Sequence, residues 1–407
     1  MSKLEQLINE LCPNGVEYRR LENCCEILDN KRKPVTKSAR EAGKYPYYGA
    51  NGIQDYVSNY IFDGTFILVG EDGSVVTEMG TPIVTWATGK IWVNNHAHII
   101  SEINGVLLRY LFHYLQTVPV KHLIHGNIPK LTGGDFRALK IAVPPLPVQK
   151  EIVRILDKFT ELTAELTAEL TARKQQYEYY KDKLLTFEYD SVAWCELNDV
   201  IISLNTGLNP RKFFRLNTED AINYYVTIRE IHGGRIVPTD KTDRINDEAL
   251  VLCNNRSNLE IGDVLFSGTG TIGETAVIVE YPQNWNIKEG VYAIKPDKKR
   301  ILSKFLRYLL TATYIKTAYM KKVAGGTVKS IPMGELRKLE IPIPYPEDKE
   351  KSLAEQQRIV DILDRFDKLC NDISEGLPAE IEARQKQYEY YRDKLLTFKK
   401  KEAAENE

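Results

Sequence analysis

The sequence predicts an α+β protein with a pseudo-two-fold internal repeat, in which two globular β-rich segments are separated by two long antiparallel coiled-coil helices. Three observations lead to this fold class. One segment occurs twice almost unchanged, apolar residues before each copy recur every three or four positions, and the rest alternates short apolar runs with turn residues. A chain of 407 residues is also too long for one compact core.

The repeat covers most of the chain. QYEYYKDKLLTF at 176–187 returns as QYEYYRDKLLTF at 387–398, and IVRILDKF at 152–159 returns as IVDILDRF at 359–366. Weaker matches join GDFRALKI at 134–141 to GELRKLEI at 334–341, LFHYL at 111–115 to FLRYL at 305–309, and Val16…Leu21 to Val192…Leu197. The offset grows from 176 through 194, 200 and 207 to 211, which indicates one duplication followed by small insertions in the second copy.

Divergence between the two copies is uneven. The helices agree even at outward polar positions, whereas residues 30–105 and 208–300 share almost nothing. We therefore expect the helices to present one surface twice, to two copies of the same partner, while each globular segment reads a different target. The alternative is that matched helices only pack on each other. The residues expected to bind the partner are Tyr177, Tyr180, Asp182, Tyr388, Tyr391 and Asp393.

Apolar residues of the helices follow a coiled-coil seam. In the first copy they run from Ile152 to Phe187, and in the second from Ile359 to Phe398, at spacings of three and four. The second copy has one extra four-residue step, and Pro378 should perturb its helix locally. TAEL occurs in tandem at 163–170, and each unit adds roughly 6 Å of helical rise. The first helix is thus expected to act as a ruler between the two segments.

The globular segments contain strand and turn signals. FILVG (66–70), KIWVNN (90–95), YYVTIREI (224–231), DVLFS (263–267), ETAVIVE (274–280) and GVYAIKP (290–296) are expected strands, and 105–117 and 301–320 expected helices. Basic, amide and hydroxyl side chains on their loops are candidates for DNA contact. These candidates are Lys31, Arg32, Lys33, Lys44, Tyr47, Tyr48, Asn51, Lys90, His122, His125, Asn127 and Lys130 in the first segment, and Arg211, Lys212, Arg229, Arg256, Ser267, Thr269, Lys288 and Lys329 in the second.

Several motifs do not support catalysis or metal binding. Residues 268–273 spell GxGxxG, but a strand-like run follows in place of the helix that a nucleotide site needs. His96, His98, His122 and His125 have no further metal ligand nearby in sequence, so no metal site is expected. No catalytic residue is expected either, because cofactor and nuclease motifs are missing. The six cysteines lack CxxC spacing, and no signal peptide or membrane span is visible, so the chain is expected in the cytoplasm.

These features together resemble the specificity subunit, HsdS, of type I restriction–modification systems. The helices IVRILDKFTELTAELTAEL and ARQKQYEYYRDKLLTF look closest to the type IC branch, and YPYYGANGIQDYV (45–57), ILVGEDGS (67–74) and GDVLFSGTGTIGE (262–274) look like its target-recognition domains. The turn that often opens such a domain reads GLNPRK at 207–212, which departs from the family's pattern.

The resemblance implies which function each part of the chain and each partner subunit would have. Each target-recognition domain would bind one half of a bipartite site in double-stranded DNA, and the helices would set the gap and dock two methyltransferase subunits. S-adenosylmethionine, ATP and Mg are expected on those and on the motor-nuclease subunits, with no cofactor on this chain. The expected segments are a first target-recognition domain (1–147), a central spacer helix (148–187), a second target-recognition domain (188–347), a C-terminal spacer helix (348–400) and a disordered tail (401–407).

Two other functions stay open from the residues alone. The chain would be a self-sufficient methyltransferase–nuclease if it bound S-adenosylmethionine by itself. It would be a protein–protein scaffold if its β-rich segments bound no DNA. The net charge of −1 does not distinguish between these functions, because any DNA-binding surface must be a local patch.

Overall fold

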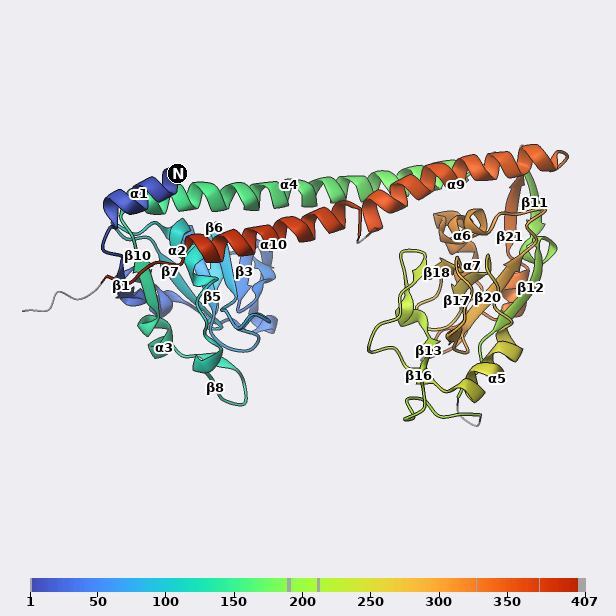
Figure 1. The fold of residues 1–407 in the computed structure, drawn as a ribbon, viewed down its shortest axis with the longest axis horizontal. Coiled ribbons are helices and arrows are strands. Elements are labelled where there is room, and N and C mark those ends of the chain that lie inside the picture. Colours follow the sequence, from blue (N-terminus) through green and yellow to red (C-terminus); the bar gives the residue numbers. More distant parts are fainter. Residues whose placement is uncertain (1, 189–191, 211–212, 327, 373, 402–407) are drawn as a thin grey trace, which may run out of the picture. The chain divides into compact units, whose positions relative to one another are not determined.

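The computed structural model describes residues 2–188, 192–210, 213–326, 328–372 and 374–401 (Figure 1). The chain divides into two units. Unit 1 comprises residues 1–165 and 381–407, and unit 2 comprises residues 166–380. Helix α4 (Leu146–Leu185) is continuous and contributes its first part to unit 1 and its second part to unit 2. Helix α10 (Leu377–Leu395) lies almost entirely in unit 1.

Unit 1 is built on a six-stranded sheet with the strand order β2-β7-β5-β6-β3-β4. A separate two-stranded pair, β1 with β10, leads into α4. Its other elements in chain order are α1 (Lys3–Leu11), β1 (Glu17–Arg20), β2 (Glu26–Ile27), β3 (Ala42–Gly49), β4 (Gly52–Val57), β5 (Phe62–Gly70), β6 (Val84–Val93), β7 (Ala97–Ser101), α2 (Leu108–Leu115), β8 (Ile124–His125), β9 (Lys130–Leu131), α3 (Gly133–Ala138) and β10 (Lys140–Val143).

Unit 2 contains a four-stranded sheet, β12-β20-β17-β18, and a three-stranded sheet, β16-β13-β19. The pair β11 with β21 leads into α9, as β1 with β10 leads into α4. The elements are β11 (Val192–Glu196), β12 (Ile201–Thr206), β13 (Asn223–Val226), β14 (Ile231–His232), β15 (Arg235–Ile236), β16 (Arg244–Ile245), α5 (Asp247–Ser257), β17 (Val264–Ser267), β18 (Thr275–Val277), β19 (Trp285–Ile287), β20 (Val291–Pro296), α6 (Ser303–Thr311), α7 (Thr313–Met320), α8 (Met333–Arg337), β21 (Glu340–Pro344) and α9 (Lys349–Asn371).

The two units share a four-stranded core. The order β2-β7-β5-β6 in unit 1 has the same pattern as β12-β20-β17-β18 in unit 2. Successive side chains of a strand point to opposite faces. Accordingly Ile67 and Val69 of β5 join the core beneath α2, while Phe66 and Leu68 join a second core on the other face. Val264 and Leu265 of β17 are divided in the same way. The duplication is therefore present in the fold even where the sequences have diverged.

Both copies anchor the long helix to the globular domain through a buried glutamine. Gln149 on α4 accepts a hydrogen bond from the Leu107 N–H (2.9 Å) and donates to the carbonyls of Gly105 and Pro144. Gln356 on α9 accepts from the Leu302 N–H at the same distance and donates to the Arg300 carbonyl. Both glutamines are completely buried. Gln149 and Gln356 are separated by 207 residues, as are the matched segments 152–159 and 359–366 that follow them. The glutamine anchor was therefore duplicated together with the helices.

Within each unit the seam residues of the long helices face one another. Phe159 of α4 stacks on Tyr391 of α10 at 5.3 Å in unit 1, and Tyr180 of α4 stacks on Phe366 of α9 at 5.8 Å in unit 2. In unit 2 the earlier Tyr177 also packs on Phe366. The predicted apolar seam is therefore a packing surface in both units, and α4 and α9 run antiparallel along it in unit 2 (Figure 1).

The C-terminal helix differs from the prediction of a single helix over 348–400, because it is divided into α9 and α10. The carboxylate of Asp372 accepts hydrogen bonds from the N–H groups of Ser374 and Glu375, which turns the chain out of the helix. Pro378 then lies in the first turn of α10, where its missing N–H costs little. The predicted local perturbation at Pro378 is thus a full interruption.

Two further element predictions are wrong in detail. The helix expected over 301–320 is two helices, α6 and α7, which end and begin around Ala312. YYVTIREI is not one strand, because Thr227 and Glu230 make a capping box that starts a 3₁₀ turn between β13 and β14, which begins at Ile231. The strands expected at FILVG, DVLFS and GVYAIKP are confirmed. None of the helices formed by the described residues is both long and apolar enough to cross a membrane.

Candidate nucleic-acid interface

A tight turn follows the central strand of each unit and is held by an identical set of backbone hydrogen bonds. In unit 1 the Gly73 N–H donates to the Pro129 carbonyl (2.9 Å), and the Leu131 N–H donates to the Glu71 carbonyl (2.8 Å). These bonds attach the turn after β5 to the hairpin of β8 and β9. The residues between the two bonds form an antiparallel bridge, Asp72 with Lys130.

Unit 2 repeats this arrangement with different side chains. The Gly270 N–H donates to the Lys329 carbonyl (3.0 Å), and the Ile331 N–H donates to the Gly268 carbonyl (2.9 Å). The bridge is Thr269 with Ser330. Gly73 and Gly270 both have positive φ, near +87° and +81°, which a residue with a side chain adopts only with strain. We name residues 71–74 with 125–130 "surface 1", and residues 268–271 with 328–330 "surface 2".

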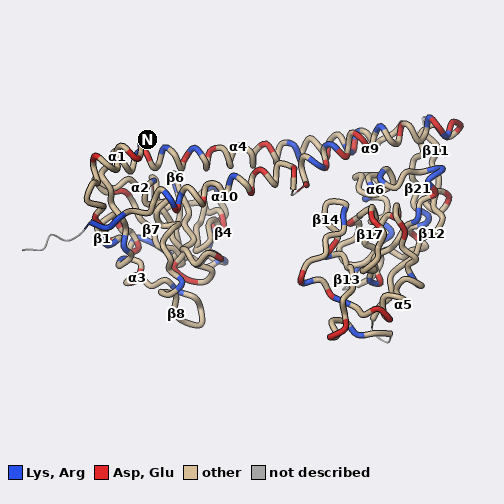
Figure 2. The backbone as a smooth tube through the Cα atoms, viewed as in Figure 1, with Lys and Arg blue, Asp and Glu red and all other residues tan. Residues whose placement is uncertain are grey.

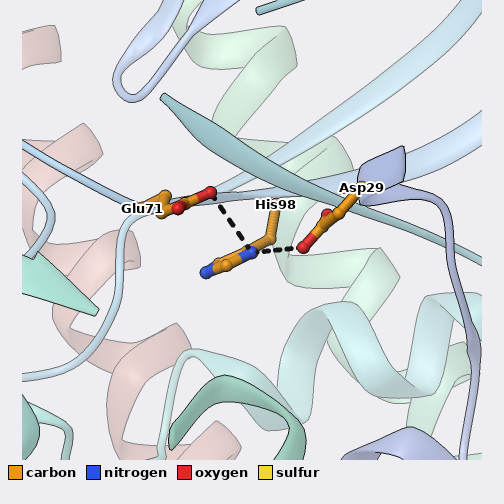
Figure 3. Close-up of side chains that lie close together, drawn as sticks. All are labelled: Asp29, Glu71 and His98. Atoms are coloured by element: carbon orange, nitrogen blue, oxygen red, sulfur yellow. Dashed lines mark hydrogen bonds and ion pairs between the residues drawn. The ribbon is translucent and has the colours of Figure 1, made fainter. Parts of the chain in front are cut away.

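Behind surface 1 lies a network of buried charges (Figure 3). His98 Nδ1 is 2.7 Å from Asp29 Oδ2 and 3.6 Å from Glu71 Oε2, while His98 Nε2 is 3.1 Å from the Leu131 carbonyl. Arg32 Nη1 donates to Glu71 Oε2 at 2.6 Å, and Lys130 Nζ lies 3.1 Å from Glu71 Oε1. Burial opposes ionisation of Glu71, but Arg32 and His98 outweigh it, so the pKa of this carboxyl lies below its usual value.

Asp29, Glu71 and His98 are close enough to be considered as metal ligands, since their ligand atoms lie within 4.8 Å of one another. The hydrogen bonds argue against that use. Both ring nitrogens of His98 already lie within hydrogen-bonding distance of an oxygen atom, so each has a partner inside the protein. The Glu71 carboxylate is already neutralised by Arg32 and Lys130. The cluster is a charge-compensated network that fixes the turn after β5 to β7 and to the hairpin.

Unit 2 achieves the same attachment with a tyrosine. Tyr292 of β20 pairs with Phe266 as His98 of β7 pairs with Val69, and its hydroxyl donates to the Ile331 carbonyl at 2.7 Å. The Tyr292 ring occupies the space beside Gly268, where a Cβ would come within 2.2 Å of it. Any side chain there would force the Tyr292 ring to move. This contact explains the first glycine of the GxGxxG match, and β18 follows the motif as expected.

Some of the predicted DNA-contacting residues meet at these two surfaces. His125, Asn127 and Lys130 lie on surface 1, and Asn51, in the turn between β3 and β4, faces the Ser74 carbonyl with its side-chain amide. On surface 2, Thr269 and Lys329 lie beside the turn at Lys288, because the Gly268 N–H donates to the Gly290 carbonyl. The sequence places these residues far apart, and the fold brings them to equivalent positions in the two units.

Other predicted residues lie elsewhere. Lys90 pairs with Asp63 at the beginning of β5, roughly 20 Å along the strand from the turn at its end, and Lys44 lies over the Tyr45 ring nearby. Exposed candidates on other segments are Lys31, Lys33, His122, Arg229 and Arg256. Arg211 and Lys212 lie outside the described residues. In Figure 2, basic residues of both units are interspersed with acidic ones, as the net charge implies.

Four of the predicted DNA-contacting side chains are buried or bonded within the protein. Tyr47 and Tyr48 are buried, and the Tyr47 hydroxyl bonds to the backbone of Val35. Ser267 is buried and closes the turn by donating to the Thr271 carbonyl (2.7 Å). Arg32 belongs to the charge network. We therefore leave Tyr47, Tyr48, Ser267 and Arg32 out of the candidate interface.

The matched helix ends carry a second candidate surface. Tyr177 and Tyr388, expected to bind a partner, are mostly buried, and the Tyr388 hydroxyl bonds to His113 Nδ1 (2.9 Å). Burial raises the pKa of Tyr388 to about 12. Tyr180 and Tyr391 pack along the seam, as described above. Tyrosines at these positions therefore serve the packing within each unit.

The exposed side of the same helix ends was predicted only at Asp182 and Asp393, and its other residues were not predicted from the sequence. Tyr179 and Tyr390 are both 61% exposed and occupy the same position of the repeat. An open groove in unit 2 is lined by Glu178, Tyr179, Asp182, Lys183 and Thr186. All five residues recur in unit 1, as Glu389, Tyr390, Asp393, Lys394 and Thr397. Their spacing along one helix face, outside the apolar seam, is the signal that could have identified them.

A duplicated chain with two equivalent loop surfaces and two equivalent helix faces defines the class of two-domain recognition subunits. Comparisons with known proteins identify the family. The model of the "Type I restriction modification DNA specificity domain" matches residues 13–173 and again residues 192–383. The chain belongs to this family and carries two copies of its domain. It is a non-catalytic DNA specificity subunit that works with partner subunits, which favours the DNA-recognition hypothesis over the two alternatives.

Relatives cover almost all of the chain. A putative type I restriction enzyme specificity subunit of Haemophilus influenzae is 37% identical over 94% of this chain and 96% of its own length. The EcoR124I/EcoR124II specificity subunit of Escherichia coli is 35% identical over 74% of each chain. The crystal structure of a type I S subunit from M. genitalium has a TM-score of 0.55 at 15% identity, covering 94% of this chain and 96% of that one, which indicates the same fold.

Proposed function

We propose that each globular domain of this specificity subunit reads one half of a bipartite site in double-stranded DNA. The observation that carries the proposal is the pair of equivalent surfaces, 1 and 2, which have the same backbone frame and different side chains. A shared frame would present both surfaces to a duplex in the same way, and different side chains would select different bases. The expected target-recognition domains, 1–147 and 188–347, each contain one such surface.

The long helices supply two further functions in this proposal. The TAEL repeat of α4 sets the gap between the half-sites, since each unit adds roughly 6 Å of rise. The exposed faces around Tyr179 and Tyr390 dock two methyltransferase subunits, because identical side chains at equivalent positions fit two copies of one partner. The residues of these two faces are identical in the two copies and are also mostly exposed, whereas the residues of the buried seam are alike because they pack within each unit.

The proposal assigns all cofactor chemistry to the partners. As a specificity subunit the chain implies no cofactor of its own. S-adenosylmethionine would be bound by the methyltransferase subunits, and ATP and Mg by the motor-nuclease subunits.

The test is DNA binding by the complex of this chain with its methyltransferase subunits. We expect selection from a random duplex library to yield two short fixed sequences separated by an unspecified gap of constant length. Affinity should fall steeply with salt, because contacts to phosphate release counterions. A complex that enriches no sequence at moderate salt, or enriches one uninterrupted sequence, would refute the bipartite mechanism.

A further inference from the structure

We propose that Ile128 and Val328 are specificity-determining residues that contact base edges in a groove of the DNA. This inference rests on the proposed function and goes beyond it, because it assigns the base contact to one apolar side chain in each domain. Neither residue is basic, so charge alone would not identify them.

The two residues occupy the same position relative to the backbone frame. Ile128 directly precedes Pro129, whose carbonyl accepts from Gly73, and Val328 directly precedes Lys329, whose carbonyl accepts from Gly270. A glycine with positive φ precedes each of them, Gly126 (+89°) two residues before Ile128 and Gly325 (+112°) three residues before Val328. Loops of unrelated sequence thus place a branched aliphatic residue at one corresponding position.

Both side chains project into solvent. Ile128 is 69% exposed and Val328 is 62% exposed, although each lies next to a backbone that is pinned on both sides by hydrogen bonds. A pinned loop cannot turn its apolar side chain inward. Both residues are also branched at Cβ, which restricts χ1, so less rotamer freedom is lost when they are buried against a ligand.

The surroundings of both residues fit a duplex. In surface 1 His125, Asn127 and Lys130 lie within three residues of Ile128 in the chain, and in surface 2 Lys329 follows Val328 directly while Thr269 pairs with Ser330 across the bridge. Basic and amide groups hold phosphate and base edges, while an apolar side chain between them matches the methyl group of thymine. Because Lys130 is paired with Glu71, surface 1 offers less free positive charge than its lysine suggests, which increases the share of recognition left to Ile128.

The experiment compares Ile128→Ala and Val328→Ala with the wild type, each assembled with the methyltransferase subunits, by sequencing duplexes selected from a random library. We expect Ile128→Ala to reduce discrimination about tenfold at one or two base pairs of one half-site and to leave the other half-site unchanged. Val328→Ala should affect only the opposite half-site. Matched controls are Leu11→Ala in unit 1 and Ile202→Ala in unit 2, whose exposed apolar side chains (43% and 69%) lie on other elements.

Several outcomes overturn the inference. Unchanged preferences in both variants, or an equal loss of affinity for every sequence, would show that these side chains do not contact bases. Loss of methyltransferase from the complex would show that the loops bind protein. In these cases the wild-type complex still selects a split site. Failure of the wild type to select one would instead refute the proposed function, so the two failures are distinguishable.

Discussion

The globular domains of units 1 and 2 hold an equivalent turn in place with different side chains. In unit 1 a histidine, two carboxylates, an arginine and a lysine attach the turn after β5. In unit 2 the hydroxyl of Tyr292 donates to the equivalent carbonyl, that of Ile331, and its ring packs against Gly268 of the turn after β17. The backbone hydrogen bonds of the two turns are the same, whereas the side chains that support the turns differ. Divergence has therefore altered side chains and added different strands around a frame that stayed constant.

The matched helices show the opposite behaviour. Gln149 and Gln356 make corresponding hydrogen bonds, and Tyr179 and Tyr390 have the same exposure. In the helices, both buried and exposed side chains are the same in the two copies. The difference indicates that the helices are constrained by one repeated set of contacts, and the domains only by their backbone frame.

The largest expected effect comes from removing the buried anchors. Gln149→Ala leaves the Leu107 N–H and two carbonyls without partners, and Gln356→Ala does the same to the Leu302 N–H. We expect each variant to lower the free energy of unfolding by about 3 kcal/mol or more. Denaturant unfolding measures this, with the exposed Gln175→Ala as control. A much smaller loss for one anchor than for the other would break their equivalence.

A smaller loss is expected from Glu71→Gln, which leaves Arg32 without a full counter-charge and removes the carboxylate beside His98. At neutral pH we expect a loss of about 2 kcal/mol, because these groups are largely buried. Ionised Glu71 has a lowered pKa, so its contribution is fully present above its ordinary pKa of 4.5 and is lost as pH falls through the folded value. The difference between variant and wild type should therefore shrink toward pH 3.

Unfolding curves of both proteins between pH 7 and pH 3 test this. A pH-independent difference would mean that the charge of Glu71 does not contribute. Gly268 stands at the corresponding position in unit 2, so no such acid-sensitive contribution is expected from surface 2.

Tyr179→Ala and Tyr390→Ala should each weaken the docking of one methyltransferase subunit by about 1–2 kcal/mol, without changing the free energy of unfolding. Titration with the methyltransferase, followed by mass measurement of the complexes, should show one weakened site per variant and two in the double variant. Tyr281→Ala, which removes a tyrosine of similar exposure (65%) outside the helices, is the control. Equal binding by all variants would leave the matched helix faces without a partner role.

The smallest energetic effect is expected from deletion of Thr167–Leu170. The deletion removes roughly 6 Å of rise and brings Leu166 to the place of Leu170, so the apolar seam is preserved. Both half-sites should stay unchanged while the gap shortens by one or two base pairs. Selection from the random library reports both quantities, and Thr167→Ala, which keeps the length, is the control. A changed half-site would contradict the spacer mechanism.

The sequence by itself determined the duplication, the fold class, the long helices and most central strands, because identity and periodicity are local signals. It also indicated the family, through the helices. The division of the C-terminal helix into two was not predicted, because it depends on hydrogen bonds to Asp372. The break of the predicted helix at Ala312 was not predicted either.

Only the tertiary structure decided which polar residues are available for recognition. Tyr47, Tyr48 and Ser267 have suitable chemistry but are buried, whereas Tyr179 and Tyr390 were overlooked beside seam tyrosines of identical type. It also revealed that the turns at Gly73 and Gly270 are bound to loops more than fifty residues away by the same backbone bonds. Backbone hydrogen bonds place no demand on side-chain identity, so a frame can persist after every recognisable sequence match has gone.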